Sequence, residues 1–152
     1  AKGGWEYFSG SFYYKSSAAK TWQESRDAYL QKGADLVIVN SKEEQDFIIK
    51  FKNEMWIGLT DSETEGTWKW VDGTPLNESY CNSGEPNGGK VENCLEIRYF
   101  DSENSWNDLS CSNSRNWICE LKDYNSPSKT TRQKTNNDKY IADTIEIFPK
   151  TT

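Results

Sequence analysis

Large aromatic side chains are the strongest constraint that this sequence places on its fold. The chain of 152 residues has seven Trp, eight Tyr and six Phe, while its aliphatic content is modest. Its core must therefore rely on rings, each of which buries a large area. The rings occur in short runs broken by Gly, Asn, Asp and Ser, which predicts many short strands and long loops. The length is enough for one domain with a hydrophobic core and too short for two.

Two segments carry the signals that start a helix. A capping box at Thr21–Glu24 predicts a helix that runs to about Lys32, with Trp22, Ser25, Tyr29 and Leu30 on its inward face, and a second box at Ser41–Glu44 predicts another helix. Residues 5–15 predict a strand or a hairpin that turns at Gly10. Further strands are expected at residues 34–39, 55–59, 67–71, 94–100 and 116–120.

Two stretches have neither the pattern of a helix nor that of a strand. Residues 73–92 have little periodicity and many turn residues, and a loop of this length in a compact domain is usually functional. After Leu121 the composition changes to Ser, Thr, Asn and Lys, with little apolar content before residues 140–148. We therefore expect a folded domain over residues 1–121 and a polar, mostly disordered tail over residues 122–152.

The charge of the chain favours cations over polyanions as ligands. The net charge is −6, and residues 122–152 contribute six basic and four acidic side chains, so residues 1–121 carry −8. An acidic domain is a poor binder of nucleic acid or of an anionic membrane. The sequence contains no His, which removes the commonest general base and the commonest transition-metal ligand. Carboxylate and amide oxygens are, in contrast, the ligands that calcium prefers.

The cysteines point to an oxidising compartment. Their positions, 81, 94, 111 and 119, do not fit a zinc or a redox motif, so we interpret them as disulfide partners. Asn77-Glu78-Ser79 is a glycosylation sequon and agrees weakly with secretion. We recognise neither a membrane-spanning apolar run nor a signal peptide, and we expect an extracellular protein, either secreted in mature form or the ectodomain of a membrane receptor.

Oxygen-bearing side chains gather in three short segments of the second half of the domain. They are Glu85-Pro86-Asn87, Glu92 and Asn107-Asp108. Calcium takes about 6–8 oxygen ligands, so five such residues nearly fill its coordination shell and leave places open. Three carboxylates around a divalent ion leave a formal charge of −1, which favours neutral further ligands such as sugar hydroxyls. Composition alone supports equally well a solvated polar loop with a proline turn.

Many ordered motifs resemble those of the C-type lectin-like domain family, over about residues 4–121. They are Gly4-Trp5, Trp22, Ala34-Asp35-Leu36, Ser41-x-x-Glu44-Gln45, Trp56-Ile57-Gly58-Leu59, Gly66-Thr67-Trp68-x-Trp70, Glu85-Pro86-Asn87, Trp106-Asn107-Asp108 and Trp117-Ile118-Cys119-Glu120. The resemblance implies an α+β double-loop fold with two helices and small antiparallel sheets. It looks closest to the mannose-type receptors of vertebrate macrophages and dendritic cells, which implies a carbohydrate-recognition domain with a role in innate immunity.

The resemblance also implies a calcium site that binds sugar directly. Its ligands fall on Glu85, Asn87, Glu92, Asn107 and Asp108, and none of them is missing. In such sites two vicinal sugar hydroxyls coordinate calcium, while carboxylates accept and amides donate charge-assisted hydrogen bonds. In the family the Glu-Pro-Asn order goes with mannose, fucose and N-acetylglucosamine, and Gln-Pro-Asp goes with galactose.

A second calcium site and the disulfides follow the family pattern only in part. Asp61, Glu65 and Glu92 match the family's auxiliary site, where Gly88 and Asn93 replace amide or acidic ligands. Cys94 and Cys111 match the inner disulfide, so we expect that bond. Cys119 matches one half of the outer disulfide, but the partner position is Tyr29, and we expect no bond between Cys119 and Cys81.

The sequence therefore predicts calcium-dependent binding of glycans with equatorial vicinal hydroxyls. The alternative is a C-type lectin-like protein that binds another protein or ice, because fold does not fix function. We do not expect an enzyme, because the acidic residues are assigned to calcium and no other acid–base pair is evident. A homo-oligomer is compatible with this function because it would raise avidity.

Overall fold

The computed structural model describes residues 4–125, which form two α-helices and eight strands. The elements are β1 (Trp5–Phe8), β2 (Ser11–Lys15), α1 (Trp22–Asp27), β3 (Asp35–Leu36), α2 (Lys42–Ile49), β4 (Met55–Thr60), β5 (Lys69–Trp70), β6 (Cys94–Ile97), β7 (Trp106–Leu109) and β8 (Asn116–Lys122). Short 3-10 turns lie at η2 (Leu30–Lys32) and η3 (Gly89–Val91). Neither helix of this part of the chain is long and apolar enough to cross a membrane.

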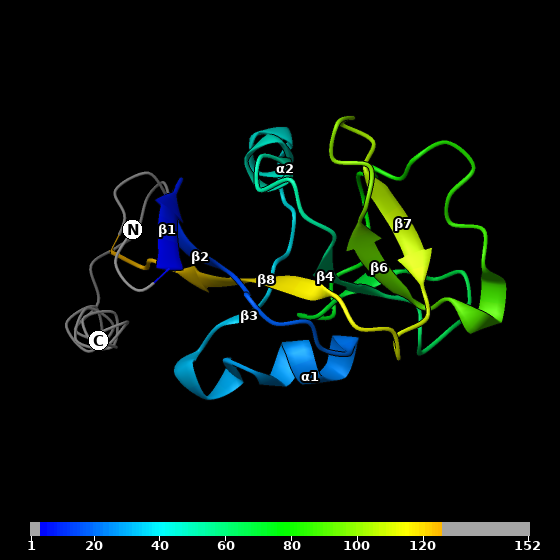
Figure 1. Ribbon diagram of the computed structural model, residues 1–152, viewed down its shortest axis with the longest axis horizontal. Helices are drawn as coiled ribbons and strands as arrows, with labels where there is room; N and C mark the ends of the chain where they lie inside the picture. Colours follow the sequence, from blue (N-terminus) through cyan, green and yellow to red (C-terminus); the bar gives the residue numbers. More distant parts are fainter. Residues whose placement is uncertain (1–3, 126–152) are drawn as a thin grey trace.

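The strands form a twisted sheet in the order β1-β2-β8-β4-β6-β7, with β3 added to β8 and β5 added to β4. All pairs are antiparallel except β4 with β8, which is parallel. In Figure 1 the helices lie on opposite sides of the central strands, and η3 lies at the end of the molecule far from β1. The α+β fold predicted from the sequence is confirmed, with one parallel pair joining its two antiparallel halves.

The first helix starts where the sequence predicts and ends earlier. The Thr21 hydroxyl accepts a hydrogen bond from the Glu24 N–H at the start of α1, but the helix ends at Asp27 and not near Lys32. Tyr29 then leaves the helical conformation at φ −126° and ψ 15°. Its ring contacts the rings of Trp5, Tyr14 and Trp117, with centroids 5.1–5.7 Å apart. The predicted inward position of Leu30 is wrong, because this side chain is 41% exposed.

Other boundaries also differ from the sequence pattern. Of the strand expected at residues 34–39 only Asp35–Leu36 forms a strand, although Val37 and Val39 are buried. The second helix begins as predicted, with the Ser41 hydroxyl accepting from the Glu44 N–H. Strand β7 was not predicted, because Asn107 and Asp108 break its apolar pattern. It forms because it pairs along its whole length with β6.

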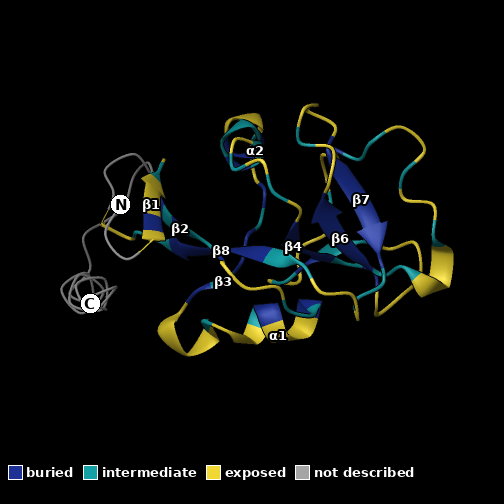
Figure 2. Ribbon diagram, in the orientation of Figure 1, coloured by how far each residue is buried: buried dark blue, intermediate teal, exposed yellow. Residues whose placement is uncertain are grey.

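The core relies on indole rings, as the composition predicts. Six of the seven Trp are buried, all except Trp68, and Trp56 and Trp106 are fully buried. Figure 2 shows the buried residues concentrated along β8, β4, β6 and β7. A buried indole N–H usually has a hydrogen-bond acceptor. The Trp22 N–H donates to the Ile57 carbonyl at 2.9 Å and the Trp56 N–H donates to the Lys20 carbonyl at 3.0 Å, which connects α1 and β4.

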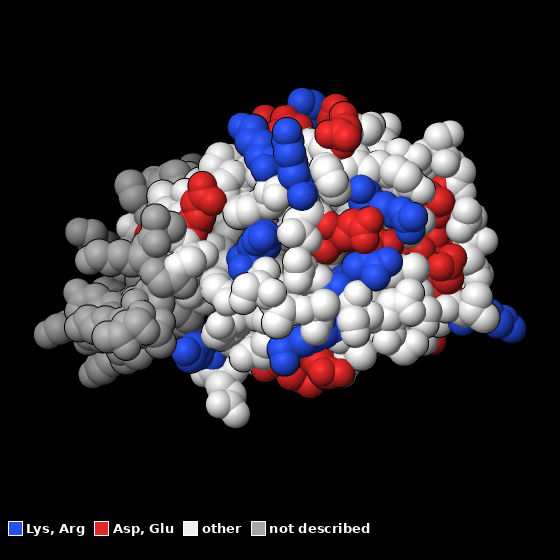
Figure 3. Space-filling model, viewed as in Figure 1, with Lys and Arg blue, Asp and Glu red and all other residues white. Residues whose placement is uncertain are grey.

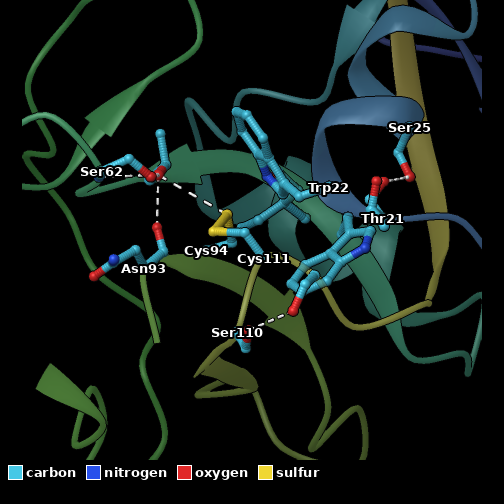
Figure 4. The surroundings of a disulfide bond; sticks show 12 residues. Thr21, Trp22, Ser25, Ser62, Asn93, Cys94, Ser110 and Cys111 are labelled. Atoms are coloured by element: carbon cyan, nitrogen blue, oxygen red, sulfur yellow. Dashed lines mark hydrogen bonds between the residues drawn. A yellow bond between two sulfur atoms is a disulfide. The ribbon is translucent and has the colours of Figure 1, made fainter. Parts of the chain in front are cut away.

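One disulfide is present, and it is the predicted one. Cys94 of β6 is bonded to Cys111, which lies just beyond β7. Trp22 of α1 lies beside this bond, and its backbone N–H donates to the Cys111 carbonyl at 3.1 Å (Figure 4). Cys81 and Cys119 are both free, so no bond joins them, as expected, but the interpretation of all four cysteines as disulfide partners is wrong for these two. The prediction of a disordered tail stays a prediction, because residues 126–152 lie outside the described part of the chain.

The aromatic contacts of Tyr29 predict that it contributes to stability at the position where the family pattern implies a disulfide. We expect Tyr29→Ala to lower the free energy of unfolding by about 2–4 kcal/mol, less than for a fully buried ring because Tyr29 is half-buried. Leu30→Ala, one residue further, is the control and should change it by about 0.5 kcal/mol or less because Leu30 is exposed. Urea unfolding measures both values, and equal effects of the two substitutions would contradict this role.

Candidate functional site

The predicted site residues come from two segments that run side by side. Glu85, Asn87 and Glu92 lie on the long loop between β5 and β6, and Asn107 and Asp108 lie on β7. The loop is attached to β7 by backbone bonds on both sides of Trp106. The Trp106 N–H donates to the Tyr80 carbonyl at 3.0 Å, and the Asn82 N–H donates to the Trp106 carbonyl at 2.9 Å. These two bonds hold the loop against β7, so the part of the loop that carries Glu85 begins beside the residues that follow Trp106.

Asp108 holds the tip of the loop in place. Its carboxylate accepts hydrogen bonds from the Asn87 N–H at 3.0 Å and from the Gly88 N–H at 2.8 Å. The side chain is almost completely buried. Two backbone donors on one buried carboxylate fix the conformation of residues 87 and 88, because neither N–H can turn away without leaving one buried carboxylate oxygen without a donor.

Glu85 is the residue with the most unusual electrostatic environment. Its Oε1 accepts from the Asn87 side-chain amide at 3.2 Å, while its Oε2 is buried and has no hydrogen-bond partner among the described residues. The Glu85–Pro86 peptide bond is cis. Burial, and after it the neighbouring Asp108 carboxylate, raise the pKa of Glu85 to about 7. A buried carboxylate oxygen without a donor needs either a proton or a cation.

Glu92 approaches the same place from the other end of the loop. Burial raises the pKa of this carboxyl, and the nearby Asp108 and Glu96 carboxylates raise it further. A Cβ atom added to Gly88 would lie only 2.0 Å from Glu92 Oε1, so the Glu92 side chain occupies the space above Gly88. Only glycine allows this close approach. The structure therefore brings Glu92 to the segment that Asp108 holds.

The fifth predicted residue, Asn107, is oriented by a residue that the sequence analysis missed. The Asn107 amide nitrogen donates to Glu96 Oε2 at 2.9 Å, and the Arg115 Nε donates to Glu96 Oε1 at 2.8 Å. Glu96 has no exposed surface. A Glu inside the otherwise apolar strand Cys94–Ile97 was the signal that could have found it, because a buried carboxylate must have partners.

The predicted residues fit a hard cation such as calcium. They offer carboxylate and amide oxygens, and one of these, Glu85 Oε2, is buried without a donor. Among residues 4–125 no group of three or more His, Cys, Asp or Glu side chains is arranged as a ready metal cluster. The amide oxygens of Asn87 and Asn107 would therefore have to complete the shell, as expected from the sequence.

The residues proposed for a second site are brought together only in part. A cavity of about 210 Å³ is lined by Asp61, Glu65 and Glu92, together with Asn87 and Asp108 of the primary site. Asp61 Oδ1 and Asn93 Oδ1 are both buried without hydrogen-bond partners in the described chain. Asn93 does not line this cavity, however, and Gly88 has no side-chain ligand to give. The auxiliary site thus has acidic walls and fewer ligands than the primary one.

The rest of the described surface offers no stronger candidate. A larger cavity, of about 440 Å³, is lined by Trp70, Pro75 and Tyr80 and by none of the predicted site residues. The face in Figure 3 shows acidic and basic side chains interspersed, so its described part carries no extended basic patch for nucleic acid.

Comparison with known families identifies the class to which this fold and site belong. The family model for the lectin C-type domain matches residues 18–121. The chain therefore belongs to the C-type lectin family, whose members are generally calcium-dependent carbohydrate binders and not enzymes. The resemblance found in the sequence and the prediction of a non-enzymatic protein are confirmed.

Individual relatives support the same assignment. The chain is similar to CD209 antigen-like protein A of Mus musculus, with 42% identity over 82% of this chain and 53% of that protein. It therefore spans about half the length of that relative. The structure resembles the carbohydrate-recognition domain of the mouse scavenger receptor C-type lectin, with a TM-score of 0.75, 34% identity and coverage of 84% of this chain and 100% of that one. It also resembles the cow CD23 domain determined in the presence of a GlcNAc2Man3 oligosaccharide, with a TM-score of 0.72, 36% identity and coverage of 80% and 95%.

The raised pKa of Glu85 predicts a titration near neutral pH in the metal-free protein. Glu85 should hold its proton as the pH falls below about 7, where a free Glu is still ionised. This group therefore stabilises the metal-free fold at low pH, and its contribution is lost as the pH rises through about 7. Carboxyl carbon NMR in the presence of a chelator measures this pKa. Asp108→Asn should lower it, and an unchanged pKa in that variant would contradict the coupling.

Proposed function

We propose that the domain binds glycans through a calcium ion held by Glu85, Asn87, Glu92, Asn107 and Asp108. The observation that carries this proposal is the buried, unpaired Glu85 Oε2 beside the Asp108 carboxylate. Two carboxylates in contact repel each other unless positive charge lies between them. When bound, calcium would supply that charge and open coordination positions for two vicinal sugar hydroxyls.

The residues around the ion would then select the sugar. Ionised Glu85 and Glu92 accept hydrogen bonds from sugar hydroxyls, whereas the amides of Asn87 and Asn107 donate them. The order of acceptor and donor across Pro86 is that of family members that prefer mannose, fucose and N-acetylglucosamine, and we propose the same sugars here. The oligosaccharide named for the cow CD23 structure contains two of these sugars.

We extend the proposal to the setting of the protein and to a second ion. The carboxyl groups of Asp61, Glu65 and Glu92, which line one cavity, support a weaker auxiliary calcium site. Asn93, the fourth proposed ligand, has a buried unpaired oxygen but does not line that cavity, so its side chain would have to move to reach the ion. Similarity to a CD209-type protein supports an extracellular domain, secreted or on a membrane receptor of innate immunity. Assembly into a homo-oligomer would give such a domain avidity for repeated glycans.

A glycan array tests the proposed function directly. The domain should bind mannose-, fucose- and N-acetylglucosamine-terminated glycans in calcium, and binding should disappear when a chelator is added. Asp108→Asn should lose both calcium and glycan, because it removes a charge and an acceptor for two backbone N–H groups. Binding that persists in the chelator, or binding only to protein or ice, would favour the alternative ligand class and refute the proposal.

The acceptor–donor order across Pro86 predicts an exchange of sugar preference. Glu85→Gln combined with Asn87→Asp reverses which side chain donates and keeps the net charge, so calcium should still bind. Mismatched hydrogen bonds to mannose should cost about 1–3 kcal/mol, enough to shift the preference toward galactose. Competition by monosaccharides against an immobilised mannose ligand measures the shift.

A matched control makes the same two changes outside the site. Glu78→Gln with Asn77→Asp exchanges the same residue types at exposed positions, and it should leave the preference unchanged. If the Glu85/Asn87 variant bound calcium normally and still chose mannose, these residues would not determine selectivity.

A further inference from the structure

We infer that Glu96 is a positioning residue for the proposed calcium site: it fixes the Asn107 side-chain amide so that its oxygen, and not its nitrogen, is presented as a ligand. This inference rests on the proposed function and adds to it a residue that never touches calcium or sugar. It starts from the pairing of β6 with β7, in which Glu96 and Asn107 lie directly opposite each other. Side chains at such opposed positions lie on the same face of the sheet and contact each other.

The contact between the two side chains has only one allowed orientation. An ionised carboxylate accepts hydrogen bonds and cannot donate one, whereas an Asn amide has one accepting oxygen and one donating nitrogen of nearly equal size. Asn107 therefore turns its nitrogen to Glu96 Oε2, at 2.9 Å. The opposite orientation would place two oxygens against each other in a buried place. The Asn107 oxygen consequently points away from Glu96.

Orientation matters here because calcium is bound by oxygen and not by an amide nitrogen. If the Asn107 amide group were rotated by half a turn about its bond to Cβ, its nitrogen would present an N–H donor to the cation. Glu96 prevents this rotation from a position with no exposed surface, where water cannot replace it as an acceptor. A buried acceptor of this kind acts on the ligand as the partners of metal-binding residues do in other sites.

Arg115 pairs with Glu96 and holds it in place. Its Nε lies 2.8 Å from Glu96 Oε1, so each carboxylate oxygen has one donor. The Arg115 Nε also lies 3.4 Å from Glu54 Oε2, whose side chain is 46% exposed. Arg115 therefore keeps a carboxylate partner when the charge of Glu96 is removed, which favours folding of a Glu96→Gln variant. Glu54 is also a matched control, because it contacts Arg115 but not Asn107.

The first experiment compares Glu96→Gln with Glu54→Gln in the full chain. In Glu96→Gln the amide oxygen should accept from Arg115, so the amide nitrogen faces Asn107 and turns the Asn107 oxygen inward. Calcium affinity, measured by calorimetric titration, should fall by on the order of tenfold or more, as for other partners of metal ligands. Glu54→Gln should leave it unchanged. Unchanged calcium affinity in Glu96→Gln would overturn the inference.

A double-mutant cycle separates positioning from a general structural effect. Asn107→Asp in the wild-type background places a carboxylate against Glu96, so it should not raise calcium affinity. The same substitution in Glu96→Gln meets a donating amide and should restore the affinity by on the order of tenfold. The double variant has the wild-type net charge. An equal effect of Asn107→Asp in both backgrounds would overturn the inference.

Metal-free measurements keep the two proposals distinguishable. If Glu96→Gln shows no cooperative thermal unfolding in a chelator, Asn107→Asp and the double variant are compared with each other, and equal affinities overturn the inference. If the wild-type chain binds no calcium, the proposed function fails by itself. The Asn107 side-chain amide is then followed by NMR in the metal-free protein, where its protons should be protected from exchange and lose that protection in Glu96→Gln. Unprotected protons in the wild type would overturn the inference.

Discussion

The burial of Trp106 is the constraint on which the rest of the structure depends. Its ring has no exposed surface and meets the rings of Trp70 and Tyr80 edge to face, at centroid distances of 5.7 and 5.3 Å. Its indole N–H donates to Gln45 of α2 at 3.0 Å. One side chain thus connects α2, β5, β7 and the long loop. Because Asn107 and Asp108 follow it directly, the same packing that builds the core also places the site.

Some buried carboxylate oxygens in the site have hydrogen-bond donors, and one has none. Asp108 is satisfied by two backbone N–H groups and Glu96 by Asn107 and Arg115, whereas Glu85 Oε2 has no donor. Such an oxygen is rare in folded proteins, because burying a carboxylate oxygen without a hydrogen-bond donor costs free energy. Its presence at a functional position is explained when a ligand supplies the missing positive charge. In the metal-free state the fold thus contains an unfavourable feature, the unpaired Glu85 oxygen, and cation binding would remove it.

Stability near the N-terminal half depends on rings at the place where the family pattern implies a second disulfide. Cys119 is buried and free, and Tyr29 occupies the position of its expected partner. The Tyr29 ring packs against Tyr14 and Trp117, at centroid distances of 5.1 and 5.5 Å. Aromatic contacts of this kind stabilise by dispersion and by complementary quadrupoles, each contributing about 0.5–1.5 kcal/mol beyond the buried area. A cluster of several such contacts offsets part of the stability that the absent cross-link would provide.

The sequence by itself determined the family, the residues of the candidate site, the disulfide between Cys94 and Cys111, and the starts of both helices. These depend on local chemistry, such as the caps at Thr21 and Ser41, or on motifs in a fixed order. Only the tertiary structure decided the early end of α1, the strand β7 and the roles of Glu96 and Arg115. Each of these depends on a partner distant in sequence. Tyr29 departs from the helical conformation and packs against Trp5 and Trp117. The role of Glu96 becomes apparent only when β7 places Asn107 opposite to it.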